Sequence, residues 1–434
     1  MKYILSKYTY IFFENGKYFL FNSQSLLFIE ISQSLYNKLS SPIIHFNGEK
    51  DDLFLIDKKI IINEDNNDDF FYDQKVKSSQ AFYSNDSISL VLIPCTGCNF
   101  ACPYCFENHK PENYMSDMVI DKLCIFIKDH KDAKSLDLTW YGGEPLLGFN
   151  VIQKIFAKFE TELNIPINKH SIVTNGYLLS DEVIAFFKKN KLDNIQITLD
   201  GLEENHNKTR RLKNTGEPTY KRIIDNIGKI IEAWPNTDIK IRVNVEALYC
   251  DDFIKVYNNI ISLYGKERLN IYPGFIRKDN PEKNNFDCGE MWKYQQQKLF
   301  LKLYDMGVYS NCYPKHITKG CMVNHINSYI IGPNGEIYKC WNDVGNKSRI
   351  IGYIDQEKLT NKSLFSKYMA ELSCFEDEKC KNCLFFPICS GGCSWYRFKN
   401  KYNNGKYNIC TIHKDNDMLK KYLMIHYHKI LSSK

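Results

Sequence analysis

Sixteen cysteines are distributed unevenly along this chain of 434 residues, and they constrain its fold more than any other feature. The first 94 residues contain none, whereas four lie in Cys95–Cys105 and nine in Cys312–Cys410. The charged residues Lys7, Glu14 and Lys17 interrupt the apolar N-terminal sequence, so we expect no signal peptide and a cytoplasmic location. Disulfides are rare in a reducing compartment, where grouped cysteines are typical of metal ligands.

The composition is that of a globular protein with two to four domains, at about 150 residues per domain. Hydrophobic residues make up 44% of the chain and charged residues 25%. The net charge of +6 is a weak excess without a basic block, so we expect no nucleic acid partner. No run of eighteen apolar residues occurs, so we expect no membrane span either.

Residues 1–63 are expected to form a small unit of strands and a short helix. Segments 8–13, 17–21 and 26–31 are rich in aromatic and β-branched residues, and an Asn-Gly pair at 15–16 predicts a hairpin between the first two. A helical pattern covers residues 32–39. The acidic run after it predicts a solvated linker over residues 64–86.

Residues 87–310 alternate between strand and helix patterns. Ile120, Leu123, Cys124 and Ile127 recur at helical spacing, and a second such stripe runs from Tyr220 to Ile231. Six βα units predict an α/β domain with a parallel sheet, for which an open or closed (β/α) barrel and a doubly wound sheet are both possible. The expected strands are 88–93, 136–140, 170–174, 194–199, 239–245 and 268–272.

Regular periodicity stops in residues 311–416, which form the expected third region. Short hairpins, Gly/Pro turns and cysteines dominate it, including a turn at 332–335 between strands 328–331 and 336–339. Such a segment has little apolar periodicity, so we expect metal binding to order it. Residues 417–434 are expected to form a terminal helix.

The first group of cysteines has the spacing Cys98-x3-Cys102-x2-Cys105. Three thiolates on one loop can hold three corners of a cubane iron–sulfur cluster and leave its fourth iron open. A closed structural zinc site needs four ligands, so a zinc knuckle or buried thiols are the weaker interpretations. Cys95 lies outside this spacing and is expected to be a packed side chain.

This spacing, with the aromatic Tyr104 before the last cysteine, resembles the CxxxCxxC signature of the radical S-adenosylmethionine (SAM) enzymes. In that superfamily the open iron is chelated by the amino and carboxylate groups of SAM. Reduction of the cluster cleaves SAM to methionine and a 5′-deoxyadenosyl radical, which abstracts a hydrogen atom. The resemblance therefore implies an oxidoreductase with a partial (β/α)6 TIM-type barrel.

Further matches to the superfamily follow the predicted strands, where parallel sheets place their active sites. Segment 142–145 reads Gly-Gly-Glu-Pro, like the family segment whose backbone accepts the SAM amino group, and glycines let a main chain approach a ligand closely. The alternative to a role in SAM binding is a structural role in a turn for Asn175 and Asp200. For Arg242 the alternative is a strand position at the surface. Arg242 and Asn244 share one strand face. The implied SAM pocket comprises Tyr104, Gly142, Gly143, Glu144, Pro145, Asn175, Asp200, Arg242 and Asn244.

The C-terminal cysteines resemble a SPASM domain, which some radical SAM enzymes carry. By that resemblance an outer auxiliary 4Fe–4S cluster is held by Cys380, Cys383, Cys389 and Cys410. The inner cluster is held by Cys321, Cys340 and Cys393, with Cys312 as the candidate fourth ligand or with an open iron. A zinc ribbon is the alternative. Buried structural thiols are expected at Cys124, Cys250, Cys288 and Cys374.

The resemblance covers residues 86–415 and favours a maturase of ribosomally made peptides, which installs a thioether or carbon–carbon crosslink or a related modification. Many of these enzymes carry an N-terminal winged-helix element that binds a leader peptide as an added strand, and residues 1–63 match it in size and order. A decorating β-subdomain is the alternative. The implied partners are a precursor peptide with a leader and an electron donor of the flavodoxin or ferredoxin type.

Two other functions remain open from the sequence. Anaerobic sulfatase maturases, which make formylglycine, have an acidic residue directly after the second SPASM cysteine. Here Cys340 is followed by Trp341, with Asp343 two residues further on, and those enzymes also lack the N-terminal strand-rich unit. The non-enzymatic alternative is a metal-ordered binding or electron-carrier protein.

Overall fold

The computed structural model divides the chain into two compact units. Unit 1 comprises Met1–Tyr83, Phe300–His325 and Tyr368–Lys434, and unit 2 comprises Ser84–Leu299 and Ile326–Lys367. The structure describes all residues except 1, 47, 106–110, 246–250, 277–278, 281–284, 287–288, 309–312, 318–319, 390, 411–414 and 433–434, and it describes no side chain in 277–294. The cysteines at 250, 288 and 312 therefore lie outside the described residues.

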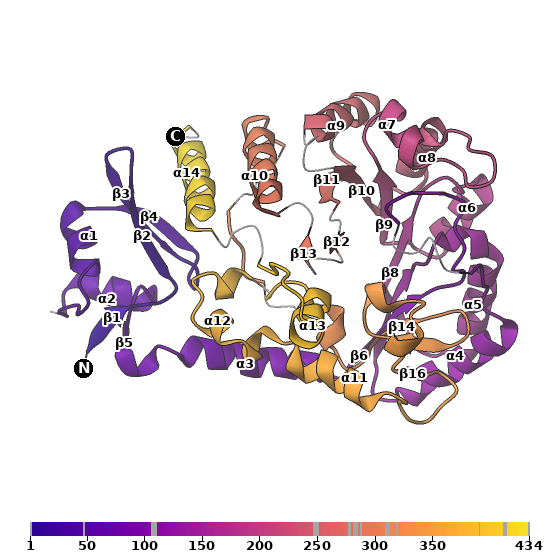
Figure 1. Cartoon of the computed structure of the whole chain (residues 1–434), viewed down its shortest axis with the longest axis horizontal. Coiled ribbons are helices and arrows are strands. Elements are labelled where there is room, and N and C mark those ends of the chain that lie inside the picture. The colour runs from indigo at the N-terminus through magenta and orange to yellow at the C-terminus, as the bar shows by residue number, and fades with distance from the viewer. Residues whose placement is uncertain are drawn as a thin grey trace. The chain divides into compact units, whose positions relative to one another are not determined.

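Unit 2 is built on a nine-stranded sheet in the order β11-β10-β9-β8-β7-β6-β14-β15-β16 (Figure 1). The predicted strands are confirmed as β6 (Ser87–Leu92), β7 (Ser135–Trp140), β8 (Ile167–Thr174), β9 (Asn194–Leu199), β10 (Asp238–Val245) and β11 (Leu269–Phe275). These six strands are all parallel to their neighbours and follow chain order. A doubly wound sheet reverses its strand order, so the arrangement is that of an open, partial barrel.

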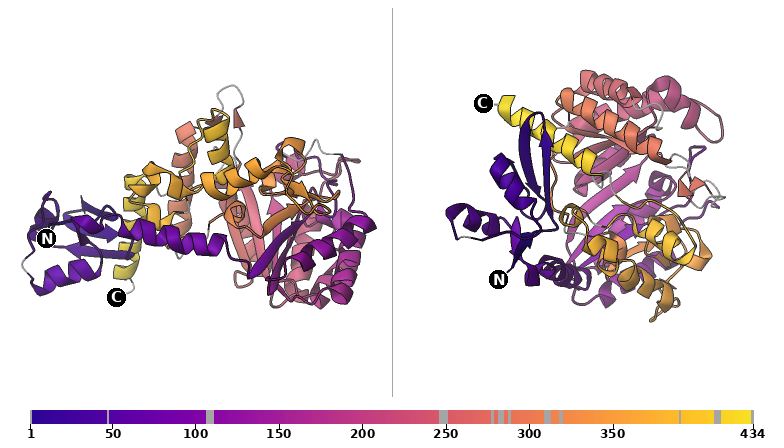
Figure 2. Two further views of the ribbon diagram at one scale, coloured as in Figure 1. Left: turned by 90° about the horizontal axis from the view of Figure 1, so that it is seen from below. Right: turned by 60° about the vertical axis from the view of Figure 1, so that its left-hand side comes forward.

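The connecting helices lie along one side of the parallel strands (Figures 1 and 2). Helix α4 buries the predicted stripe, and α8 buries Tyr220, Ile223, Ile224 and Ile227 followed by Ile230, so the stripe ends one residue before the predicted Ile231. The helices are α4 (Asp117–Asp129), α5 (Phe149–Glu162), α6 (Asp181–Lys189), α7 (Glu203–Thr209), α8 (Tyr220–Ala233) and α9 (Asp251–Tyr264).

Three short strands from the cysteine-rich part of the sequence extend this sheet. Strand β14 (Ser328–Ile331) pairs in parallel with β6, and β15 (Glu336–Tyr338) and β16 (Gly352–Tyr353) continue antiparallel. The predicted hairpin at 332–335 is confirmed, but its place beside the barrel strands was not predicted. All four residues of β14 are buried, so the strand shows no alternation that would mark it as part of a sheet.

The N-terminal part of unit 1 has the predicted hairpin and helix. Asn15 and Gly16 both have positive φ, as a tight hairpin turn requires. Strands β2 (Thr9–Glu14), β3 (Lys17–Asn22) and β4 (Leu27–Ile31) form an antiparallel sheet in the order β2-β3-β4. Around it lie α1 (Gln33–Leu39), α2 (Lys50–Asp57) and the strand pair β1 (Tyr3–Leu5) and β5 (Ile61–Asn63).

Residues 64–86, predicted to form a solvated linker, contain a helix that the sequence analysis did not predict. A short turn at Glu64–Asn66 is followed by helix α3 (Asp69–Phe82). The ring of Phe71 packs against Phe375 and Phe386, with centroid distances of 5.5 and 5.0 Å. Because its apolar partners lie some 300 residues away in the sequence, local patterning gave no sign of this helix.

The C-terminal part of unit 1 shares a hydrophobic core with the N-terminal sheet. Phe12, Phe19 and Phe21 pack with Leu419 and Leu423 of the confirmed terminal helix α14 (Asn416–Ser432). Among the described residues, none of the helices combines the length and apolar composition that a bilayer crossing requires. The remaining helices include α10 (Gly289–Asp305), α11 (Lys362–Ser366), α12 (Glu378–Lys381) and α13 (Ser394–Tyr402), and β12 (Asp279–Asn280) pairs with β13 (Asn285–Phe286).

The core of unit 2 contains a buried histidine, His170, whose two ring nitrogens both have partners. His170 on β8 accepts a hydrogen bond at Nε2 from the indole Nε1 of Trp140, at 2.8 Å. Its Nδ1 lies 2.9 Å from the carbonyl oxygen of Asn190, so these partners assign a neutral ring with the proton on Nδ1. Burial lowers the pKa of His170 to about 4.

We expect His170 to make the fold sensitive to acid. The unfolded chain binds this proton near pH 6.5 and the folded chain only near pH 4, so the stabilisation is complete above pH 6.5 and is lost as pH falls toward 4. At pH 5 the loss is roughly 2 kcal/mol. Urea unfolding at pH 7 and pH 5 measures it. In His170→Gln, which cannot titrate, the difference between the two pH values should shrink; an unchanged difference would contradict the assignment.

Candidate functional site

The three cysteines of the first group lie on one loop after β6, which we call the cysteine loop (residues 94–105). The backbone N–H of Phe100 donates to Sγ of Cys98 at 3.4 Å, and that of Cys105 donates to the carbonyl of Cys102 at 3.2 Å. Burial, then the charge of Glu144 and the other two thiols, raises the pKa of Cys98 to about 12. Ligation of a metal would require deprotonation of these thiols.

The donor set suits a cluster better than a single ion. In the described part of the chain, no three His, Cys, Asp or Glu side chains converge closely enough to hold one metal ion. A cubane spreads its thiolate ligands over separate iron atoms, so its ligands stand farther apart than those of a single ion. Three thiols on one short loop fit such a cluster.

The glycine loop (residues 142–145) packs directly against the cysteine loop. A Cβ on Gly142, whose φ is +142°, would lie 2.4 Å from the carbonyl oxygen of Cys95, and one on Gly143 would lie 2.3 Å from that of Gly97. The N–H of Glu144 donates to the same Gly97 carbonyl at 2.8 Å. The glycines thus permit the close approach of a second loop of the same chain, which the sequence did not predict.

Glu144 and Asn175 fasten the glycine loop to the end of β8. The fully buried Glu144 carboxylate accepts from the N–H of Leu146 at 3.0 Å, the hydroxyl of Thr174 at 2.8 Å and the N–H of Asn175 at 2.7 Å. Burial raises the pKa of Glu144, and the hydrogen bonds oppose this rise. Asn175 Nδ2 donates to Oδ1 of Asn99 on the cysteine loop, at 2.7 Å. Pro145 begins the short helix Pro145–Gly148.

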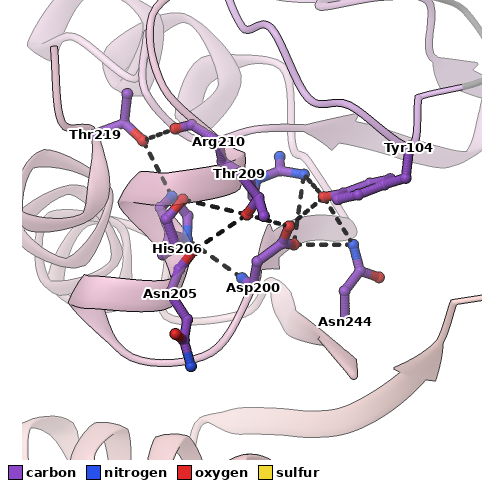
Figure 3. Close-up of polar contacts among 8 residues, drawn as sticks. All are labelled: Tyr104, Asp200, Asn205, His206, Thr209, Arg210, Thr219 and Asn244. Atoms are coloured by element: carbon purple, nitrogen blue, oxygen red, sulfur yellow. Dashed lines mark hydrogen bonds and ion pairs between the residues drawn. The ribbon is translucent and has the colours of Figure 1, made fainter. Parts of the chain in front are cut away.

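A polar network joins the cysteine loop to the ends of β9 and β10 (Figure 3). The hydroxyl of Tyr104 donates to Asp200 Oδ2 at 2.5 Å, and the hydroxyl of Thr209 donates to the same oxygen at 2.8 Å. Asn244 Nδ2 donates to Asp200 Oδ1 at 3.0 Å, and Arg210 Nη1 donates to the Tyr104 hydroxyl at 3.0 Å. The structure therefore brings Tyr104, Asp200 and Asn244 together.

The neutral side chain of His206 contacts this network through the main chain of Asp200. The N–H of Asp200 donates to His206 Nδ1 at 3.3 Å, and His206 Nε2 lies 3.0 Å from the hydroxyl of Thr219 (Figure 3). That hydroxyl donates to the carbonyl of Arg210. Burial lowers the pKa of His206 to about 3. Sequence reasoning missed His206, Thr209, Arg210 and Thr219; their only signal was their position shortly after Asp200.

Four buried polar atoms beside this network lack a hydrogen-bond partner within the described residues. They are Asn99 Nδ2, Arg210 Nε, Arg242 Nε and Asn244 Oδ1. Arg242 and Asn244 alternate on β10 as predicted, and a Cβ on Gly274 would lie 2.2 Å from Arg242 Nε, so this glycine makes room for the guanidinium group. Three donors and one acceptor are thereby available to a polar ligand.

The C-terminal cysteines have varied surroundings. In unit 1, Cys374 and Cys383 pack against Cys380 in one apolar group, and Cys374 and Cys389 line a cavity of about 40 Å³. Cys374, which was predicted to be a buried structural thiol, is half-buried and is a neighbour of predicted ligands. Cys321, Cys393 and Cys410 are exposed, and Cys95 and Cys124 are buried. Cys340 is buried and belongs to unit 2, so the predicted inner set is divided between the units.

Residues 92–244 match the Radical SAM superfamily. The chain is 25% identical over 357 residues to a cysteine-type anaerobic sulfatase-maturating enzyme of Clostridium novyi, which covers 74% of this chain and 92% of that enzyme. It is 24% identical over 402 residues to the radical SAM cyclopropyl synthase TigE of Paramaledivibacter caminithermalis, covering 82% of this chain and 78% of TigE.

Two solved structures share the fold. The structure of anSMEcpe with bound AdoMet and the Cp18Cys peptide has a TM-score of 0.59 and 20% identity, and covers 80% of this chain and 98% of that one. The structure of Streptococcus suis SuiB bound to its precursor peptide SuiA has a TM-score of 0.50 and 16% identity, and covers 95% of this chain and 99% of that one.

The packing of the two loops predicts the effect of Gly143→Ala. The added methyl group meets the Gly97 carbonyl, so the cysteine loop must move, and iron binding on anaerobic reconstitution should fall. The control is Gly216→Ala. The added methyl group meets open space there, but the positive φ costs an alanine about 1 kcal/mol of folding stability. Iron content and urea unfolding measure both effects. Equal iron content in the two variants would show that this packing does not position the loop.

Proposed function

Since this chain is a radical SAM enzyme related to the anaerobic sulfatase-maturating enzymes and to the peptide-modifying enzymes SuiB and TigE, we propose that it modifies a ribosomally made precursor peptide. The modification would be a thioether or carbon–carbon crosslink or a related change. The observation that carries the peptide assignment is the antiparallel sheet β2-β3-β4, which has two edge strands and belongs to the same unit as Cys380, Cys383, Cys389 and Cys410.

The SAM site is proposed at the carboxyl ends of β6 to β10. Cys98, Cys102 and Cys105 would ligate the 4Fe–4S cluster. When bound, the reduced cluster and SAM supply the 5′-deoxyadenosyl radical that abstracts hydrogen. The unpartnered atoms of Asn99, Arg242 and Asn244 would serve the carboxylate and hydroxyl groups of SAM. The pocket is proposed to comprise Tyr104, Gly142, Gly143, Glu144, Pro145, Asn175, Asp200, Arg242 and Asn244.

The residues of this site act mainly by positioning. The Tyr104 phenol lies between Cys102 and Cys105 in sequence and is held by Asp200 and Arg210, so the cysteine loop is fixed to the sheet. The carboxylate of Glu144 is already engaged by three donors of the protein. We therefore assign SAM contacts in the glycine loop to its main chain, and assign to the Glu144 side chain the support of that loop.

The N-terminal sheet is proposed to recognise the leader of the precursor. In the order β2-β3-β4, strands β2 and β4 are the edges, and an edge can pair with an extended peptide through main-chain hydrogen bonds. The side chain of Phe13 on β2 is 53% exposed and offers an apolar contact. The fold shared with SuiB over 95% of the chain supports this role, because that structure contains a precursor peptide.

Two auxiliary clusters complete the proposal. Cys380, Cys383, Cys389 and Cys410 would hold the outer one. Cys321, Cys340 and Cys393 would hold the inner one, with Cys312 as fourth ligand or with an open iron. Three clusters give about twelve iron atoms per chain. The reducing electron would come from a donor of the flavodoxin or ferredoxin type.

Formylglycine formation is the second candidate, favoured by the alignment over 92% of the Clostridium novyi enzyme. The residue after Cys340 counts against it. Trp341 packs edge-on against Tyr141 with centroids 4.2 Å apart. The acidic Asp343 is buried, with Arg349 Nε at 3.8 Å from its Oδ1, so its carboxylate is paired with a cation inside unit 2.

We expect Cys102→Ala to reduce SAM cleavage to background, because it removes a proposed ligand of the SAM cluster. The matched control is Cys124→Ala, which removes a buried thiol on the apolar face of α4. The measurement is 5′-deoxyadenosine and methionine released by the reconstituted, reduced protein. Wild-type rates in Cys102→Ala would refute the cluster assignment.

Short peptides encoded beside the gene should gain a mass change or crosslink when incubated with the reduced enzyme and SAM. Removing the leader from such a peptide should weaken binding at least tenfold and leave SAM cleavage intact. Mass spectrometry and titration calorimetry measure the two effects. Equal affinity without the leader would remove the recognition role of the sheet. Formation of an aldehyde from a sulfatase peptide, trapped by a hydrazine reagent, would instead favour the second candidate.

A further inference from the structure

Arg397 on α13 is a buried arginine whose side-chain donors contact groups between residues 377 and 391. Its exposed fraction is 9%. Nε donates to the carbonyl of Gly391 at 2.7 Å, Nη1 to Asp377 Oδ2 at 2.8 Å and Nη2 to Cys380 Sγ at 3.1 Å. A buried cation is costly unless it is paired and hydrogen-bonded, and here all three nitrogen atoms have a partner.

The partners of Arg397 belong to the segments that carry two proposed ligands. Asp377 caps the short helix α12, since its Oδ1 accepts from the N–H of Lys379 at 2.9 Å, and α12 carries Cys380. The N–H of Gly391 donates to Sγ of Cys389 at 3.3 Å. The guanidinium group therefore connects the carbonyl of Gly391, which lies next to Cys389, with the sulfur atom of Cys380.

Gly391 is required by this packing. Its φ is +81°, and a Cβ there would lie 2.3 Å from Cβ of Cys374 and 3.4 Å from Arg397 Nη2. The small cavity lined by Cys374, Cys389, Gly392 and Arg397 adjoins the same groups. Sulfur atoms, a cation and a cavity are thus built together within unit 1.

We infer that Arg397 is a positioning residue of the outer auxiliary cluster, which holds the Cys380 thiolate and raises the reduction potential of the cluster, and that Asp377 lowers this potential. The inference rests on the proposed function, which assigns Cys380, Cys383, Cys389 and Cys410 to that cluster. Reduction adds one electron from the flavodoxin- or ferredoxin-type donor, and no bond forms or breaks.

The sign follows from charge. The reduced cluster is one unit more negative than the oxidised cluster, so a nearby cation and a hydrogen bond to a ligand sulfur stabilise the reduced form. The guanidinium group donates to the sulfur atom of Cys380, and the Asp377 carboxylate pairs with the guanidinium group and also interacts with the Cys380 thiol. Removing the cation should make reduction harder, and removing the anion should make it easier.

The experiment compares Arg397→Gln, Arg397→Lys and Asp377→Asn in the full chain after anaerobic reconstitution. Iron content and a redox titration followed by electron paramagnetic resonance are measured. Arg397→Gln should lower the midpoint potential of one cluster by at least about 59 mV, which for one electron is a tenfold change in the equilibrium constant of reduction. Arg397→Lys should recover part of the shift. Asp377→Asn should raise the potential, since asparagine retains the helix cap.

The control is Arg268→Gln, which removes a partly buried guanidinium that donates to the carbonyl of Trp234 at 2.6 Å in unit 2. No midpoint shift is expected there. If Arg397→Gln loses about four iron atoms and Arg397→Lys keeps them, the result supports the role of Arg397 in positioning the outer cluster. The direction of the potential shift is then tested with Asp377→Asn alone. Unchanged potentials, or shifts of the same sign in Arg397→Gln and Asp377→Asn, would overturn the inference. A wild-type protein with only about four iron atoms would instead reject the auxiliary clusters of the proposed function.

Discussion

The contact between the cysteine loop and the glycine loop determines the arrangement of the candidate site. The carbonyl oxygens of Cys95 and Gly97 occupy the space that side chains at 142 and 143 would need, and the Gly97 carbonyl also accepts the N–H of Glu144. Glu144 in turn binds Thr174 and Asn175 at the end of the next strand but one from β6. Three strand ends are thereby joined through main-chain contacts and one buried carboxylate, and the thiols inherit their positions from this packing.

The six parallel strands and the apolar faces of α4 and α8 could be predicted because each repeats a simple pattern over many residues. Tyr104, Asp200 and Asn244 could be placed near one another because loops after parallel strands meet at one edge of the sheet. Their partners could not. His206 and Arg210 lie on or next to a seven-residue helix, where one histidine and one arginine look like ordinary surface residues until the tertiary structure buries them.

The same limitation applies to the elements whose stability comes from distant partners. Helix α3 has a mixed sequence, and its Phe71 is buried by aromatic rings at 375 and 386. Strand β14 has four residues and pairs with β6, more than 200 positions earlier in the chain. In both cases, the decisive contact is non-local, whereas the sequence patterns that we used describe only local periodicity. The contacts of Cys374 with predicted ligands escaped notice for the same reason.

The shared core of unit 1 has a consequence for synthesis of the chain. Phe12, Phe19 and Phe21 leave the ribosome about 400 residues before Leu419 and Leu423, against which they pack. Until then the aromatic face of the first sheet has no native cover from α14, so it is open to chaperones and to wrong partners. Synthesis of α14 and completion of the core under the N-terminal sheet are therefore coupled in time. A chain cut short before α14 would expose these rings and would be prone to aggregation.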